Sequence, residues 1–83
     1  MEETPLAHLR QKFALILANL TAPDLLELAE ALCARLLSGG ALIISGFLKE
    51  DRTRLEKRFL SLGLQEGGFL LEEDWGALIL RRP

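Results

Sequence analysis

Few side chains in this 83-residue sequence are of types that carry out chemistry, and most of these stand alone. Cys33 is the single cysteine and His8 the single histidine, which excludes an internal disulfide and any cysteine-based zinc site. We interpret Cys33 as a small apolar residue on a buried helix face. We interpret His8 as an ordinary polar residue of the N-terminal segment. The sequence therefore predicts no metal site.

The serine, acidic and glycine residues near the predicted strand ends give no catalytic pattern either. Ser45 follows an apolar run, but a serine without a nearby base is not an activated nucleophile. We interpret Glu72-Glu73-Asp74 as a solvated turn, because no paired carboxylates with distinct environments are evident. The pairs Gly39-Gly40 and Gly67-Gly68 do not match a G-x-G loop between a strand and a helix. The residue types and spacings therefore identify no cofactor-binding residues.

Asn19 is the remaining candidate for a functional side chain. It lies near the end of Phe13–Leu20, a nearly continuous apolar run typical of a strand buried on both faces. Ligands of open α/β sheets bind at the carboxyl ends of such strands. Asparagine is also common where strands end. From the residues alone, Asn19 is either a binding residue or simply a strand boundary.

A helix is predicted to follow over residues 22–37. Thr21 can cap it, Pro23 suits its first turn, and Asp24 stands where a capping box would place it. Its apolar residues recur at spacings of three and four, which indicates an amphipathic helix. Ser38-Gly39-Gly40 is expected to end it.

A second strand is predicted over Ala41–Phe47. With the intervening helix it forms a βαβ unit, so the two strands should be parallel. A second helix is expected over Lys49–Leu62, with an ion pair between Glu50 and Arg54 four residues apart. Gly63 is expected to end this helix.

The C-terminal part predicts an antiparallel hairpin of residues 64–71 and 75–82. Gly67-Gly68 suggests a bulge in its first strand, and Trp75 is expected to cover the core. The element order is therefore β-α-β-α-β-β, an α/β chain. Because a parallel pair is followed by a hairpin, the last strand must enter the sheet antiparallel to its neighbours.

The composition restricts the possible partners. The net charge is −2, hydrophobic residues make up 49%, and mean hydropathy is +0.21, which argues against disorder and against a nucleic-acid partner. No uncharged apolar run is long enough for a membrane helix, so no membrane partner is expected. The acidic start does not resemble a secretory signal, and the expected location is the cytoplasm.

Four stretches carry a resemblance to a known family: FALILANLTAPDLLELA (13–29), LSGGALIISGFLKE (37–50), LGL (62–64) and WGALIL (75–80). They resemble the end of class I S-adenosylmethionine-dependent methyltransferases, in particular the bacterial enzymes that methylate the eleventh protein of the large ribosomal subunit. The resemblance runs from about Pro5 to the C-terminus. Residues 1–83 would then be a single fragment, the C-terminal half of a methyltransferase domain.

The resemblance implies a partial Rossmann-like methyltransferase sheet. The complete sheet has the order 3-2-1-4-5-7-6, and this chain would supply strands 4 to 7. Asn19 matches the asparagine of the family's fourth motif, whose side-chain carbonyl and following backbone carbonyl accept hydrogen bonds from the target amine. Leu20 and Thr21 would adjoin the substrate. The motif Asn-Leu-Thr-Ala departs from the Asn-Pro-Pro-aromatic form of better-known nitrogen methyltransferases.

The implied function is that of the C-terminal part of a ribosomal protein N-methyltransferase, inactive on its own. S-adenosylmethionine would bind the full-length enzyme but not this chain, which lacks the main cofactor motif. The alternative is a non-catalytic module that uses the half-fold for self-association or protein binding. In either case the apolar first strand needs a partner, which would be the remaining N-terminal half of the domain or a second copy.

Overall fold

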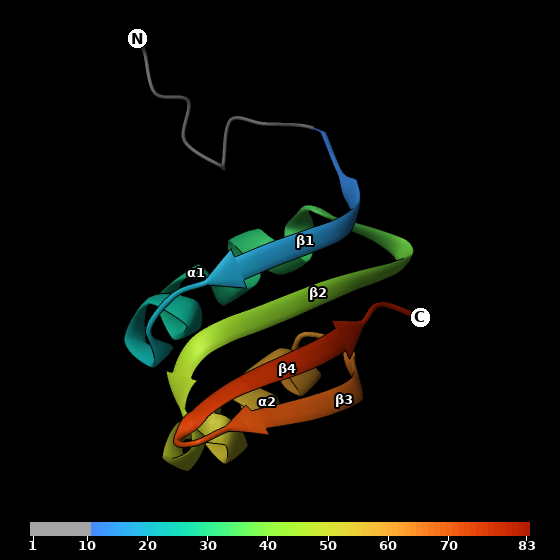
Figure 1. Cartoon of the computed structure of the whole chain (residues 1–83). Coiled ribbons are helices and arrows are strands. Elements are labelled where there is room, and N and C mark those ends of the chain that lie inside the picture. Colours follow the sequence, from blue (N-terminus) through green and yellow to red (C-terminus); the bar gives the residue numbers. More distant parts are fainter. Residues whose placement is uncertain (1–10) are drawn as a thin grey trace, which may run out of the picture.

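The computed structural model describes residues 11–83 and shows one four-stranded sheet with two α-helices (Figure 1). His8 and Pro5–Arg10 lie outside the described residues. The elements follow the predicted order, with a short 3₁₀ helix, η2, between β2 and α2. Their bounds are β1 Phe13–Asn19, α1 Ala22–Ala34, β2 Leu36–Leu48, η2 Lys49–Asp51, α2 Arg52–Ser61, β3 Gln65–Glu72 and β4 Trp75–Arg81.

The strands are arranged in the order β1-β2-β4-β3. β1 and β2 are parallel, whereas β4 runs antiparallel to both β2 and β3. The last strand therefore inserts between β2 and β3 and runs antiparallel to both, as predicted. This order is the one that the resemblance implies for strands 4-5-7-6 of a methyltransferase sheet, and the predicted α/β fold class is confirmed.

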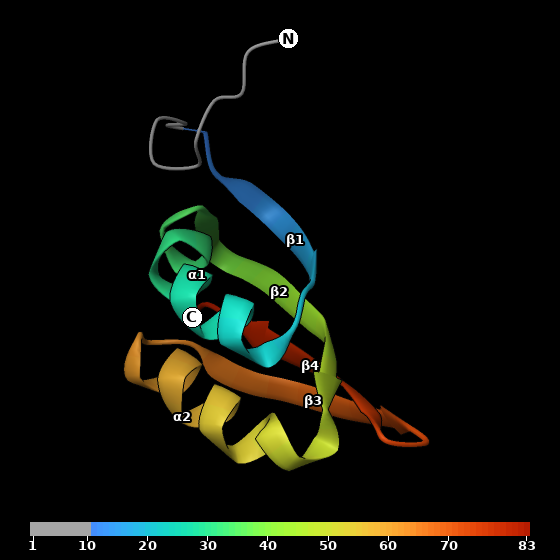
Figure 2. The same ribbon diagram turned by 90° about the vertical axis from the view of Figure 1, so that its left-hand side faces the viewer.

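Both helices lie on the same side of the sheet (Figure 2). The core forms between the helices and that side. Cross-strand neighbours share a face, so the inward-facing strand residues Leu42, Ile44, Leu78 and Leu80 are fully buried. Cys33 belongs to this core, as predicted, and burial raises the pKa of its thiol.

The opposite side of the sheet is covered by no element of residues 11–83 (Figure 2). Leu15 and Leu17 of β1 point to this side and are 56% and 70% exposed. This agrees with the expectation that the apolar first strand needs a partner beyond the described residues. The strand has the apolar composition of a doubly covered strand, but only one cover is present.

The N-terminal end of α1 agrees with the sequence in part. Thr21 is the N-cap residue and Pro23 lies in the first turn, where a missing N–H costs nothing. The Thr21 side chain makes no capping hydrogen bond, so the expected capping box does not form. Asp24 still places a negative charge in the first turn, where the helix dipole favours it.

The C-terminal end of α1 comes earlier than predicted. The helix ends at Ala34, and Ser38-Gly39-Gly40 lies inside β2. The Phe13 N–H donates to the Arg35 carbonyl at 2.7 Å, and the Gly39 N–H donates to the Arg82 carbonyl at 2.8 Å. These hydrogen bonds to neighbouring strands draw the segment into the sheet, and Gly39 takes the left-handed φ of +78° within it.

The second helical segment differs from the prediction in its first turn. Residues 49–51 form a 3₁₀ turn, and α2 proper begins at Arg52. Arg54 pairs with Asp51 at 3.0 Å, and no ion pair joins it to Glu50 among the described contacts. Gly63, at φ +97°, follows α2 as predicted.

The hairpin turns at Glu73-Asp74 and contains the expected irregularity beside Gly67-Gly68, where the pairing shifts between Glu66 and Gly68. The acidic turn is exposed, as predicted.

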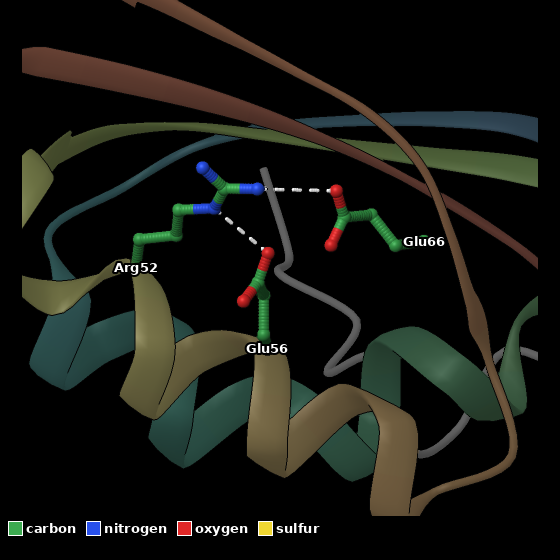
Figure 3. Close-up of polar contacts among 3 residues, drawn as sticks. All are labelled: Arg52, Glu56 and Glu66. Carbon is green, nitrogen blue, oxygen red and sulfur yellow. Dashed lines mark hydrogen bonds and ion pairs between the residues drawn. The ribbon is translucent and has the colours of Figure 1, made fainter.

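An ion-pair cluster links α2 to β3 (Figure 3). The Arg52 Nε lies 2.8 Å from a Glu56 carboxylate oxygen, and its Nη2 lies 3.2 Å from a Glu66 oxygen. The same guanidinium stacks on the Phe69 ring, 3.9 Å from its centroid. Hydrogen bonding between the carboxyl groups raises the pKa of Glu66 and, together with Arg52, lowers the pKa of Glu56.

Candidate functional site

An open hollow of about 690 Å³ lies at the carboxyl ends of β1 and β2, beside the hairpin. Cross-strand pairing places Asn19, Ser45, Ala77 and Leu70 in one row across the sheet. This row lies on the face that the helices do not cover. The lining residues are Asn19, Ser45, Gly46, Leu70, Leu71, Glu72, Trp75, Gly76 and Ala77.

Backbone geometry shapes the floor of this hollow. The Leu20 N–H donates to the Ser45 carbonyl at 2.9 Å, which continues the parallel pairing one residue past β1. Between Ser45 and Phe47 the pairing of β2 with β4 shifts by one residue, and Gly46 occupies the shift at φ +91°. Because an extra residue re-aims its neighbours, Phe47 turns into the core while Ser45 stays at the hollow.

The polar groups of the hollow suit a hydrogen-bond donor. Asn19 offers a side-chain carbonyl, and Glu72 offers a carboxylate. Leu70, Leu71 and Trp75 supply apolar walls and are all more than half exposed. No lysine, arginine or histidine is among the lining residues. An amine carried on an aliphatic chain matches this combination better than an anion does.

The structure unites some of the predicted site residues and separates others. Asn19 and Ser45 both line the hollow. Leu20 packs partly against the core, Thr21 is the N-cap residue of α1, and neither is among the lining residues. Their backbones still adjoin Asn19 at the end of β1.

Trp75 corrects a sequence prediction. It was expected to cover the core, but it is 54% exposed and lines the hollow. Alternation along β4 places it on the same face as Ala77 and Ile79, away from the helices. The hairpin residues Leu70, Leu71 and Glu72 were not predicted as site residues. Their composition gave no signal, because only the insertion of β4 beside β2 brings the hairpin to the end of β1.

Neither α-helix of residues 11–83 follows its preceding strand through a glycine-rich turn, the feature that typically holds a nucleotide-type cofactor. The turn from β1 into α1 contains no glycine, and of the left-handed glycines Gly39, Gly46 and Gly63 only Gly46 lines the hollow, where it lies within β2. No group of three or more metal-ligating side chains occurs within residues 11–83. Within the same range, neither helix has the length and apolar character needed to cross a membrane.

Comparison with known proteins assigns the chain to a family. The model of the family "Ribosomal protein L11 methyltransferase (PrmA)" matches residues 2–83. A ribosomal protein L11 methyltransferase of Geobacter metallireducens is 38% identical over 76 residues, which are 92% of this chain and 25% of that protein. The corresponding protein of Chloroflexus aurantiacus is 41% identical over 71 residues, or 86% of this chain and 22% of that protein.

The crystal structure of the ribosomal protein L11 methylase from Lactobacillus delbrueckii subsp. bulgaricus superimposes with a TM-score of 0.86 at 30% identity. The match covers 93% of this chain and 40% of that one. This chain thus spans about a quarter of the length of the curated relatives it matches, and it corresponds to their C-terminal part. The chain belongs to the ribosomal protein L11 methyltransferase family.

Proposed function

We propose that this chain supplies the amine-binding end of an S-adenosylmethionine-dependent methyltransferase that acts on a ribosomal protein. Residues 1–83 would be one C-terminal segment of its methyltransferase domain. The observation that carries the proposal is the position of Asn19 at the end of β1, where it lines the hollow. The residues that line this hollow include no lysine, arginine or histidine. The hollow lies at the carboxyl ends of β1 and β2, the edge at which open α/β sheets bind their ligands.

Asn19 and the backbone of Leu20 are proposed to orient the acceptor amine. The Asn19 side-chain carbonyl and the Leu20 backbone carbonyl each accept one hydrogen bond from the amine, which directs the nitrogen lone pair away from both oxygens. Orientation of this kind lowers a barrier by restricting the reacting groups before reaction. The apolar walls hold the aliphatic part of the substrate, and Glu72 favours a positively charged approach.

The methyl donor is proposed to be held by a part of the fold other than residues 11–83, since no glycine-rich turn joins β1 to α1. We therefore expect no measurable binding of S-adenosylmethionine to this chain alone. Calorimetric titration tests this point. A dissociation constant in the micromolar range, equivalent to about −8 kcal/mol, would contradict it.

The test of the main proposal is Asn19→Ala in an intact family member that has asparagine at this position. Turnover should fall by about 100-fold, the scale expected when a reacting group is misplaced, while the unfolding midpoint stays unchanged. Ser38→Ala is the matched control, because Ser38 is an exposed polar residue of β2 outside the hollow. Equal activity of the two variants would show that Asn19 only ends the strand and does not bind the acceptor amine.

The uncovered apolar face supports a second proposal, self-association of the chain when it is on its own. β1 is an edge strand of the described sheet, and Leu15 and Leu17 are exposed on the same face as Ile43 and Ile79. Edge strands and apolar faces of this kind pair with other chains. In the parent enzyme, the rest of the methyltransferase fold would occupy this face. In isolation, a second copy would occupy it.

A further inference from the structure

Gly46 stands directly beneath the Asn19 side chain. A Cβ atom built on Gly46 would lie 2.4 Å from the Asn19 Oδ1, 3.0 Å from the Leu20 carbonyl oxygen and 3.1 Å from the Leu20 nitrogen. All three distances are shorter than ordinary van der Waals contacts. The two carbonyl oxygens are the same atoms that the proposed function assigns to the acceptor amine.

No hydrogen bond to another residue of the 11–83 segment holds the Asn19 side chain. Its position therefore depends on the space available to it, and the absence of a side chain at Gly46 provides that space. The Asn19 Oδ1 is the end of a short side chain, so an added Cβ would displace the amide more readily than it would displace the backbone of Leu20.

We infer that Gly46 is a positioning residue for Asn19, which keeps the asparagine carbonyl beside the Leu20 carbonyl at the floor of the hollow. The catalytic part of this inference rests on the proposed function of Asn19. The geometric part does not, because contact between the two residues can be measured without any substrate.

A second feature of Gly46 must be separated from this contact. At φ +91°, any L-residue is strained regardless of its neighbours. Gly63 offers the matched control, because its φ is +97° and a Cβ there would meet nothing within 4 Å. Gly63→Ala therefore has the same kind of backbone strain without the contact.

The experiment compares Gly46→Ala, Gly63→Ala, Asn19→Ala and the two double variants with Asn19→Ala. Thermal unfolding of the 83-residue chain is the first measurement. Because removal of the Asn19 side chain relieves its contact with the new Cβ, Gly46→Ala should lower the unfolding midpoint less in the Asn19→Ala background. Gly63→Ala should lower it equally in both backgrounds, as independent sites do.

Nuclear magnetic resonance gives the second measurement. Asn19 is the single asparagine of the sequence, so its side-chain amide signals are readily assigned. They should shift in Gly46→Ala and lose their contacts to residue 46, and they should stay in place in Gly63→Ala. Unchanged Asn19 signals in Gly46→Ala, or equal midpoint losses in the two backgrounds, would overturn the inference. Complete unfolding of Gly46→Ala in both backgrounds would also overturn the inference. It would mean that Gly46 is needed for its close approach to the Leu20 backbone and not for the position of Asn19.

Turnover is measured in an intact relative that has glycine and asparagine at these two positions. Gly46→Ala should lower kcat by about 100-fold, as Asn19→Ala does, and the double variant should be no slower than Asn19→Ala. A double variant with a much greater loss than either single change would show independent roles and overturn the inference. If Asn19→Ala itself leaves turnover unchanged, the proposed function fails. The contact between Gly46 and Asn19 is still tested by the unfolding and nuclear magnetic resonance measurements.

Discussion

The two faces of the sheet have similar apolar compositions but opposite surroundings. Leu42 and Leu80 on one face are fully buried beneath α1 and α2, whereas Leu15 and Leu17 on the other are more than half exposed. Alternate residues of the same strands build both faces. The difference therefore comes from what packs against the sheet and not from the strands themselves.

This contrast separates two roles within one small chain. The helix-covered face contains the hydrophobic core and hence most of the hydrophobic stabilisation of the chain. The open face contains the hollow with Asn19 and Trp75. A face that is free of helices can receive a substrate and a further part of a protein, but it contributes little to the stability of the chain in isolation.

The largest expected effect compares leucines on the two faces. Leu80→Ala removes a fully buried side chain and should lower the free energy of unfolding by about 2–5 kcal/mol. Leu17→Ala removes a side chain that is already in water and should change it by less than about 0.5 kcal/mol. Urea denaturation at low protein concentration measures both. Equal losses would mean that the open face is covered in solution.

The second prediction concerns association through the open face. Sedimentation equilibrium at micromolar concentration should show that the wild-type chain is dimeric or larger. Leu17→Lys places a charge on the open face at the edge strand β1 and should shift the chain toward the monomer. Leu60→Lys is the control, because Leu60 is similarly apolar and exposed but lies on α2. A well-folded wild-type monomer would remove the case for self-association.

The smallest expected effect lies on the helix side of the molecule. Hydrogen bonding to Glu56 raises the pKa of Glu66, so the contribution of Glu66 to stability is present below its ordinary pKa and is lost as pH rises through its folded pKa. Glu66→Gln removes this titration. The stability of the variant relative to wild type should therefore increase as pH rises from about 4 to 7.

Denaturant midpoints across this pH range measure the difference. Glu73→Gln, in the exposed turn, is the control and should show no comparable trend. A relative stability of Glu66→Gln that falls with rising pH would show that the ion pair with Arg52 outweighs the interaction between the carboxyl groups.

Much of the fold could be predicted from local patterns. The apolar runs, the helical spacing in α1 and the glycine after α2 depend on neighbours within a few residues, and all three predictions were confirmed. The same local patterns placed the end of α1 too late. Ser38-Gly39-Gly40 is a typical helix terminator, but hydrogen bonds to a strand more than 40 residues later draw it into β2.

The candidate site could be predicted only in part. Asn19 was singled out because it ends an apolar strand and resembles the asparagine of a family motif. Leu70, Leu71 and Trp75 were not, because their role depends on a distant strand pairing and not on their own neighbours. Gly46 carried no sequence signal beyond its type, since its contact with Asn19 exists only when β1 and β2 lie side by side.

The amino-acid sequence by itself determined the element order, the family and the position of Asn19 at a strand end, because each of these depends on residue types and short spacings. Only the tertiary structure decided which face of the sheet is covered and which hairpin residues meet Asn19. Alternation along a strand gives two faces without saying what packs on either one. That outcome depends on how α1, α2 and β4 pack together, which brings residues far apart in the chain to the same edge of the sheet.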